Sequence, residues 1–470
     1  MLDSKWRISF AMTLAFILCI VPLRVSGQAM QVISIDASRS AGTIKRVNDV
    51  DNGPLCQRGI VDLSPYYKEL GIRNVRLHDV PWTYDNVLDI NYVFPDWNAD
   101  PSRPESYDFQ QSDFYIKSIT DLGINIIFRL GYSAEYKTSA RHNAPPDSFD
   151  KWADVAAHIV AHYNQGWANG PKANIRYWEI GNEPDGDGLV FWKGTPESFY
   201  RLYDVVARKV KSIDPTLKVG GPAIVGSLPF LRGFLLYSQQ HHSPVDFVSW
   251  HIYTQDPQAV VRHANDIHQL MTQYGYQDAE NILDEWNYGP SDWRKMFVDP
   301  VATREYFDAA EDSYGAAFDA TVMTDLQDAP VDIATFYSGT TFMWGLFTSS
   351  GAPQKPYYTF LAFQRLLETP KRIAIKPLNE ENLVALAGVS EDSKTVRILV
   401  TNLAREKRRV HLEISHLPWN SGSAYEQRVV DSGHDLSTMK SGPVLNADQS
   451  IDVEVDGPSV SLITVHPITR

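Results

Sequence analysis

Apolar runs and helical stretches alternate along the middle of the chain, from about residue 45 to residue 365. Short apolar runs bounded by turn residues predict seven strands. They are Asn74–Asp79, Asn125–Tyr132, Arg176–Pro184, Lys218–Pro222, Val245–Tyr253, Asn281–Tyr288 and Thr335–Gly345. A weaker first strand is expected near Arg46–Val50. Each gap between successive strands is long enough for a crossover helix, which a parallel pair requires.

The segments between these strands carry helical periodicity. Val260, Ala264, Ile267, Met271 and Tyr274 recur at steps of three or four residues and therefore line one face. Two further stripes have the same spacing: Tyr115, Ile119 and Leu122, and Trp152, Val155, Ile159 and Tyr163. We interpret all three stripes as core-facing. Repeated alternation of strand and helix predicts an α/β fold, a (β/α)8 TIM barrel over residues 45–365, with a doubly wound open sheet as the alternative.

The pattern changes after about residue 370, where short alternating runs are separated by turn residues. These runs predict a small antiparallel β-sandwich over residues 370–470. The expected strands are Leu383–Val389, Thr395–Asn402, Val410–Ile414, Ser450–Val455 and Ser459–Val465. Residues 28–44 are assigned to the same accessory domain, because Val32–Ile35 reads as one more strand.

The first 27 residues have the composition of a secretory signal. Lys5 and Arg7 precede Ile8–Leu23, a stretch without charge, and small residues follow at positions 25–27. An uncleaved membrane anchor is the alternative, but the run is shorter than the roughly 20 residues that span a bilayer. We therefore expect a secreted or periplasmic protein that has no membrane association after cleavage. Cys56 would then be the single cysteine, so no internal disulfide is expected.

The composition is that of a globular protein, with 21% charged residues and a formal net charge of -14. This acidity argues against a nucleic-acid partner, because binding to phosphates requires clustered Lys and Arg. The chain contains no phosphate-binding loop, dinucleotide fingerprint or serine-hydrolase elbow, and we expect no cofactor. His158 and His162 are four residues apart, as in some zinc sites, but no glutamate follows the first one, so we interpret both as helix-face residues and expect no metal.

Two predicted strands end in glutamates, at the edge where a barrel of this kind carries its chemistry. One strand runs through Arg-Tyr-Trp-Glu-Ile-Gly-Asn-Glu-Pro and places Glu183 directly before Pro184. The other reads Asn-Ile-Leu-Asp-Glu-Trp-Asn-Tyr and carries Glu285. Glycosidic bond hydrolysis needs one neutral carboxylic acid and one carboxylate, so we take Glu183 and Glu285 as the catalytic pair. Strand alternation directs Asp284 away from the face of Glu285, and we expect Glu179 and Asp284 to be structural partners.

The Trp-Glu-Ile-Gly-Asn-Glu-Pro and Asp-Glu-Trp-Asn segments resemble the retaining glycoside hydrolases of clan A. Family 39, which contains β-xylosidases and α-L-iduronidases, is the best match, and the resemblance covers both predicted domains. Three further segments fit that family's pattern: Arg76 to Asp79, Ser249 to Tyr253, and the aromatic run Phe342 to Gly345. The resemblance implies a retaining glycosidase, and a β-xylosidase-like exo activity is the leading expectation; together with the leader it predicts a secreted enzyme.

The resemblance also implies a role for each matching residue. Glu183 would be the general acid/base and Glu285 the nucleophile. Asn182 would bond the sugar 2-hydroxyl and Tyr253 would orient the nucleophile. Three residues would line the sugar pocket: His78, His251 and Trp344. Arg76 is a candidate binding residue that could instead pair with a carboxylate inside the barrel.

Two positions depart from the family's pattern, and they leave the sugar specificity undetermined. Asp284 stands where the xylosidases often have a small or hydroxylated residue, and Asp79 follows His78 in place of a glycine. The alternatives are another clan A specificity, such as an arabinofuranosidase, a glucosidase or an endo-acting exopolysaccharide hydrolase, and a catalytically silent carbohydrate-binding protein. The expected partner is an oligo- or polysaccharide, with a neutral sugar favoured over a uronate by the acidic composition. The sequence does not fix the oligomeric state.

Overall fold

The computed structural model describes residues 30–80, 86–134, 143–186, 191–341, 343–378, 380–444 and 450–468. The expected signal at residues 1–27 and Phe342 of the aromatic run lie outside the described residues. In the described part, no helix is both long and apolar enough to cross a bilayer.

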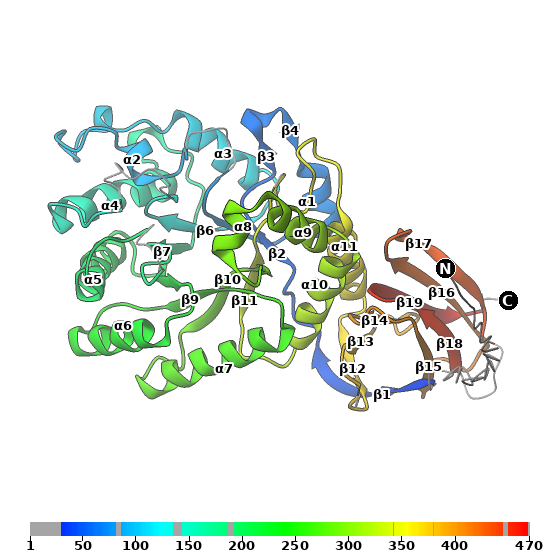
Figure 1. The fold of residues 1–470 in the computed structure, drawn as a ribbon. Coiled ribbons are helices and arrows are strands. Elements are labelled where there is room, and N and C mark those ends of the chain that lie inside the picture. The colour runs from blue at the N-terminus through cyan, green and yellow to red at the C-terminus, as the bar shows by residue number, and fades with distance from the viewer. Residues whose placement is uncertain are drawn as a thin grey trace, which may run out of the picture.

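Eight parallel strands close into a barrel surrounded by helices (Figure 1). In chain order they are β2 (Asp49–Asp51), β5 (Asn74–Leu77), β6 (Asn125–Leu130), β7 (Tyr177–Ile180), β8 (Lys218–Ile224), β9 (Phe247–Thr254), β10 (Glu280–Tyr288) and β11 (Ile333–Phe336). The last strand pairs with the first, through Thr335 beside Asp49, so the sheet has no open edge. The predicted α/β barrel is confirmed, and the open-sheet alternative is wrong.

The last barrel strand is much shorter than its sequence predicts. It ends at Phe336, and the chain then turns back on itself: the Ser338 N–H donates to the Trp344 carbonyl, and the Leu346 N–H donates to the Ser338 carbonyl. Trp344, expected at the end of this strand, therefore belongs to a loop above the barrel. The first strand lies a few residues later than expected, at β2.

The barrel helices bury the stripes that the periodicity predicts. They are α1 (Ser64–Leu70), α3 (Gln110–Thr120), α4 (Phe149–Gln165), α5 (Pro196–Ile213), α6 (Leu228–His241), α7 (Pro257–Gln273), α10 (Ser313–Asp325) and α11 (Lys355–Leu367), with additional helices α2 (Ile90–Val93), α8 (Trp293–Val298) and α9 (Pro300–Glu311) in the connections. Val260, Ala264, Ile267 and Met271 are all buried along α7. The Asp256 side chain accepts the Gln258 N–H and caps this helix, and Pro257 occupies its first turn.

His158 and His162 both lie on α4. His162 is buried, stacks on Phe109 at 3.5 Å between ring centroids, and contacts Asp113 through Nε2 at 2.8 Å. The His158 ring contacts its own helix, with Nδ1 2.7 Å from the Asp154 carbonyl oxygen. Each ring therefore has a partner of its own, and the two do not share a ligand.

A second domain is built from one continuous sheet of nine strands. They are β1 (Gln31–Thr43), β12 (Lys371–Ile375), β13 (Leu383–Val389), β14 (Val396–Asn402), β15 (Arg408–Ser415), β16 (Ser423–Val430), β17 (Asp435–Pro443), β18 (Ser450–Val455) and β19 (Ser459–Pro467). Pairing is antiparallel except between β1 and β15. Apolar residues of strands from both ends of this order share one core, so the sheet bends over on itself. The hydrophobic pattern of the sequence did not predict strands β12, β16 and β17.

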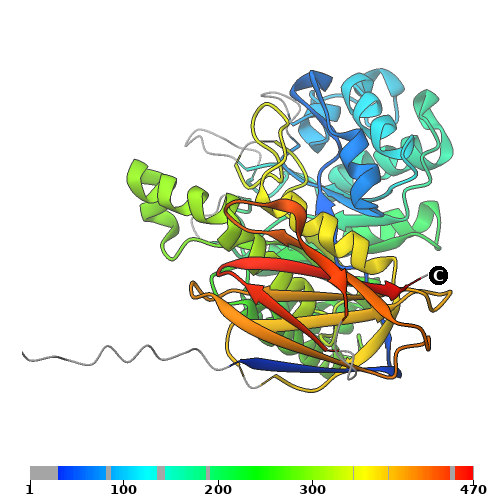
Figure 2. The same cartoon turned by 90° about the vertical axis from the view of Figure 1, so that its right-hand side faces the viewer.

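Helices α10 and α11 lie between the barrel and this sheet (Figures 1 and 2). Nearly every residue of α10 is buried, as expected for a helix covered on all sides. Leu386, Leu399 and Leu462 of the sheet belong to the same apolar cluster as the barrel core. The sheet is therefore fixed to the barrel by a continuous core, strengthened by two parallel bonds from the Arg372 guanidinium to the Asp328 carboxylate.

Candidate active site

Glu183 lies in a tight turn beyond the end of β7. The strand stops at Ile180, and Gly181 adopts a left-handed conformation with φ 83°. A Cβ at this glycine would lie 2.7 Å from the Phe199 ring, so a side chain does not fit. Glu183 is itself left-handed, with φ 43°, and its N–H donates to the Ala223 carbonyl at 2.8 Å. The turn thus holds Glu183 over the mouth of the barrel, with 17% of its side chain exposed.

Glu285 and Asp284 both face the barrel interior, because β10 contains a bulge. Leu283 pairs with Trp250 of β9 and Glu285 pairs with the next residue, His251, which leaves Asp284 as the extra residue. A bulge of this kind turns two successive side chains toward the same face. The prediction that Asp284 points away from Glu285 was therefore wrong.

Trp286 turns to the other side of β10, as strand alternation predicts. Its ring packs against Phe336 and Phe360, and the side chain is fully buried. It belongs to the layer between strands and helices and takes no part in the site.

The guanidinium of Arg76 joins the site residues into one network. Its Nε donates to Glu179 Oε2 at 2.7 Å, its Nη1 donates to Glu285 Oε1 at 2.6 Å, and its Nη2 donates to Asn182 Oδ1 at 2.6 Å. Two more carboxylates lie within 3.3 Å of the same group, those of Asp51 and Asp284. Arg76 is fully buried and therefore both pairs with interior carboxylates and fixes the nucleophile candidate.

His251 and Tyr253 of β9 contact the two glutamates from a third side. The Tyr253 hydroxyl donates to Glu285 Oε2 at 2.7 Å. The Nδ1 atom of His251 lies 2.8 Å from Glu183 Oε1 and 3.5 Å from Glu285 Oε2. An oxygen of each glutamate and a nitrogen of His251 all lie within 4.8 Å of one another. The pair predicted from strands far apart in sequence is thus brought together.

His78 and Trp344 lie beside this network and have other contacts. His78 Nε2 is 3.2 Å from Asp79 Oδ1, and the ring packs against Phe191. The Trp344 indole N–H donates to the Tyr306 hydroxyl at 3.0 Å, and the ring is partly buried. Among the described residues, neither side chain forms a hydrogen bond or ion pair with Glu183 or Glu285.

The two glutamates differ in their electrostatic surroundings. Burial, followed by the nearby charge of Asp185, raises the pKa of Glu183 to about 7, although Arg76 acts in the opposite direction. Burial also raises the pKa of Glu285, but the charge of Arg76 and the hydrogen bond from the Tyr253 hydroxyl favour its anion. Glu183, the more exposed of the two, can therefore hold a proton near neutral pH. Glu285 lies deeper and its hydrogen bonds stabilise the carboxylate form.

The histidine and the remaining carboxyls are shifted as well. Burial lowers the pKa of His251 to about 4, so the ring is neutral near pH 7. Burial raises the pKa of Asp51 and of Asp284 well above the ordinary range. Burial acts in the same direction on Glu179, but Arg76 and a hydrogen bond from Asp284 hold the pKa of Glu179 below its usual value. The guanidinium is thus balanced mainly by Glu179 and Glu285.

Sequence reasoning missed Asp51 and Asp185. Asp51 ends the weak first strand and reaches Arg76, and its strand signal was too faint to place it in the barrel. Asp185 accepts the N–H groups of Val225 and Ser227, and so it ties the Glu183 turn to the end of β8. Its position directly after Pro184 was visible, but nothing in the pattern showed its partners.

The three clustered side chains could in principle gather around a small cation. Both oxygens of Glu285, however, already accept hydrogen bonds, one from Arg76 and one from Tyr253. A metal ion bound there would also lie close to the guanidinium charge. This donor set fits a carboxylate that remains anionic and free to react better than it fits a metal ligand.

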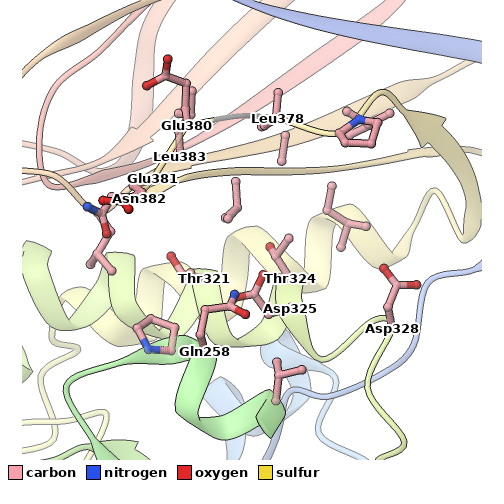
Figure 3. Close-up of a pocket in the computed structure, with 18 of the residues that line it drawn as sticks. Gln258, Thr321, Thr324, Asp325, Asp328, Leu378, Glu380, Glu381, Asn382 and Leu383 are labelled. Atoms are coloured by element: carbon pink, nitrogen blue, oxygen red, sulfur yellow. The ribbon is translucent and has the colours of Figure 1, made fainter.

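A hollow of about 930 Å³ lies away from the carboxylates, between the barrel helices and the sheet (Figure 3). Acidic residues line it on both sides, with Asp325 and Asp328 below and Glu380 and Glu381 above, the latter beside Leu378 and Leu383. None of the residues that line it belongs to the Arg76 network. It is a groove between domains, distinct from the barrel mouth.

Comparison with known proteins identifies the family. A β-xylosidase of Geobacillus stearothermophilus is 30% identical over 226 residues, which span 45% of this chain and 41% of that protein, less than half its length. A β-xylosidase of Caldicellulosiruptor saccharolyticus is 23% identical over 84% of this chain and 89% of its own. The crystal structure of a glucosidase from Croceicoccus marinus superposes with a TM-score of 0.77 and 28% identity, covering 94% of this chain and all of that one.

The family model described as glycosyl hydrolases family 39 matches residues 57–407, well over half of the chain. That range contains seven of the eight barrel strands, both glutamates, and strands β12, β13 and β14 of the sheet. The chain therefore belongs to glycosyl hydrolase family 39 and is a glycosyl hydrolase.

Proposed function

We propose that this protein is a retaining exo-glycosidase of β-xylosidase-like specificity, with Glu285 as nucleophile and Glu183 as general acid/base. The observation that carries the proposal is the pairing of two carboxyls within 4.8 Å in unlike surroundings. Retaining glycosidases hold their carboxyls about 5–5.5 Å apart, whereas inverting enzymes leave about 6.5–9.5 Å for a water molecule. The short separation therefore supports a double displacement.

In the first step, Glu285 attacks the anomeric carbon while Glu183 gives its proton to the departing oxygen. The raised pKa of Glu183, about 7, supplies a protonated acid at mildly acidic pH. The hydrogen bonds from Arg76 and Tyr253 keep Glu285 anionic and hold its carboxylate in a fixed orientation. The bond between sugar and leaving group breaks as the Glu285 ester forms.

In the second step, Glu183 takes a proton from water, which attacks the ester and releases the sugar with retained configuration. Esterification removes the negative charge of Glu285 and so lowers the pKa of Glu183 toward the anion that this step needs. Asn182 supports both steps: its Oδ1 accepts from Arg76, and among the described residues its buried Nδ2 has no partner. We assign that amide to the sugar 2-hydroxyl.

The sugar is proposed from the relatives. Two β-xylosidases match the chain, one of them over most of its length, which supports a xyloside first. A glucosidase is the second candidate, because a glucosidase structure is 28% identical over nearly the whole chain. The charged start of the chain followed by an uncharged run supports export to the periplasm or medium as part of the same proposal.

Glu183→Ala and Glu285→Ala, assayed on a panel of aryl glycosides, test this function. We expect the highest wild-type kcat/KM on the xyloside and a retained anomer by NMR of early product. Glu285→Ala should lose at least about a thousandfold in turnover, and Glu183→Ala about 10²–10⁴-fold on a poor leaving group. Wild-type turnover in either variant would contradict the residue assignment, and an inverted product would contradict the mechanism.

A further inference from the structure

Asp284 occupies a position that strand alternation alone would not give it. The bulge in β10 directs its carboxyl into the layer beneath the two glutamates, where it is fully buried. Its Oδ2 lies 3.2 Å from Arg76 Nε, and its Oδ1 lies 3.4 Å from His251 Nε2. Asp284 therefore sits behind the histidine whose other nitrogen contacts Glu183.

Asp284 and Glu179 meet at the same atom, because Asp284 Oδ2 lies 3.2 Å and Glu179 Oε2 lies 2.7 Å from Arg76 Nε. Burial, followed by the charge of Glu179, raises the pKa of Asp284 well above its ordinary range, so Asp284 is the carboxyl of the two that holds a proton. Glu179 Oε2 accepts from Arg76, and the Ser249 hydroxyl also favours the Glu179 anion, whereas among the described residues neither oxygen of Asp284 has an N–H or O–H partner. A proton on Asp284 that is donated to Glu179 satisfies this group of atoms and leaves an Asp284 oxygen free to accept.

His251 Nε2 faces that free oxygen. The nitrogen is buried and, in the part of the chain that the structure describes, has no other hydrogen-bond partner. A buried N–H without an acceptor costs about 1–3 kcal/mol, so a proton on Nε2 is favoured when it points toward Asp284 Oδ1. The neutral ring then has its lone pair on Nδ1, 2.8 Å from Glu183 Oε1.

We propose that Asp284 is a positioning residue that fixes His251 as its Nε2–H tautomer, so that Nδ1 accepts the acid proton of Glu183. The proposal rests on the assignment of Glu183 as general acid. A hydrogen bond that His251 accepts from the protonated Glu183 stabilises the neutral acid and therefore raises the pKa of Glu183. His251 neither gains nor loses a proton in this arrangement, and the Glu183 proton passes to the leaving oxygen as before.

Other charged and titratable groups surround this pair on every side. They are Asp51 of β2, Arg76 of β5, His78 after β5, Glu179 of β7, Asp185 after β7, Tyr253 of β9 and Glu285 of β10. Glu285 Oε2 lies 3.5 Å from His251 Nδ1, but both oxygens of Glu285 already accept hydrogen bonds, from Arg76 and from Tyr253. Among the described residues, Asp284 is the acceptor that faces Nε2.

Two variants at this position separate positioning from structural support. Asp284→Asn keeps an oxygen toward His251 and an N–H toward Glu179, whereas Asp284→Ala removes both. With a poor leaving group such as a phenyl glycoside, we expect the alkaline limb of kcat/KM to move down by about one pH unit in Asp284→Ala, because His251 can then donate Nδ1–H to the Glu183 carboxylate. Asp284→Asn should keep the limb near its wild-type position.

The tautomer itself can be measured by NMR with ¹⁵N-labelled histidine, with His251→Gln used to assign the signal. We expect the proton on Nε2 in the wild type and in Asp284→Asn, and on Nδ1 or exchanging in Asp284→Ala. The proposal would be overturned if Asp284→Ala kept both the wild-type position of the alkaline limb of kcat/KM and the proton on His251 Nε2. It would also be overturned if the wild-type protein carried the His251 proton on Nδ1. If Glu183→Ala keeps the alkaline limb, the acid assignment fails instead, and the NMR result still decides the tautomer.

Discussion

The two ends of the barrel interior are built from the same strands but from opposite kinds of side chain. At the end where the strands begin, Ile127, Phe247 and Ile282 form a small apolar cluster. At the end where they finish, one buried arginine lies among four carboxyls, with a histidine and a tyrosine beside them. The first end is apolar, as protein interiors usually are, whereas the second end buries several charged groups.

The difference shows where stability and activity lie in this molecule. The apolar cluster lowers the free energy of folding by removing hydrocarbon from water. The charged layer costs desolvation that its internal bonds only partly recover. Such a layer is retained at the carboxyl ends of barrel strands because reacting groups must be aimed there. Substitutions at the charged end should therefore change both stability and activity, whereas substitutions at the apolar end should change stability alone.

The largest effect is expected from Arg76→Met. Removing the guanidinium leaves Glu179 and Glu285 buried without their main cation, which typically costs about 3–5 kcal/mol in the free energy of unfolding. Turnover should fall at the same time, because Glu285 loses its anchor. Urea unfolding and kcat measured side by side test this, and a stable variant with wild-type kcat would contradict the role of the charged layer.

Ile282→Ala tests the opposite end. Ile282 is fully buried, so the cavity should cost about 2–4 kcal/mol in unfolding free energy. Below the unfolding transition, kcat/KM should stay within a few-fold of wild type, because no bond of the site is touched. A large loss of kcat/KM in a folded sample would mean that the two ends are coupled.

Tyr253→Phe removes one bond from the charged layer while keeping its shape. A hydrogen bond to a charged group is worth about 1.5–3 kcal/mol, so kcat/KM should fall about tenfold to a hundredfold. The melting temperature should change little. Unchanged kinetics would show that Arg76 alone holds Glu285.

The pH profile tests the raised pKa of Glu183. The first step needs the protonated acid, and the pKa of about 7 means that the protonated fraction is complete below that value and falls tenfold per unit above it. The alkaline limb of kcat/KM on a poor leaving group should therefore bend near pH 7. Glu183→Ala should lose this limb, and a limb that persists in the variant would assign it to another group.

The smallest effect is expected at the junction between the barrel and the sheet. Asp328 is largely exposed, so Asp328→Asn should cost less than about 1 kcal/mol and leave kcat/KM unchanged. Thermal unfolding and a standard assay check this. A large destabilisation would mean that this ion pair, rather than the shared apolar core, fixes the sheet to the barrel.

The sequence predicted the features that repeat or that carry a distinctive motif. Strand and helix periods located the barrel, and the residues around Glu183 and Glu285 indicated the two carboxyls. Asp284 was misread because a bulge shifts the alternation by one residue and leaves no mark in the hydrophobic pattern. Asp51 and Asp185 were missed because their partners come from other strands, which only tertiary contacts bring near.

Trapping the covalent intermediate tests the central claim most directly. The protein would be incubated with 2-deoxy-2-fluoro-xylosyl and 2-deoxy-2-fluoro-glucosyl fluorides, digested, and its labelled peptide sequenced by mass spectrometry. The account predicts time-dependent inactivation with one fluorosugar ester on Glu285, on an enzyme whose turnover yields the retained anomer. A label on another carboxylate, or an inverted product with no label, would contradict it.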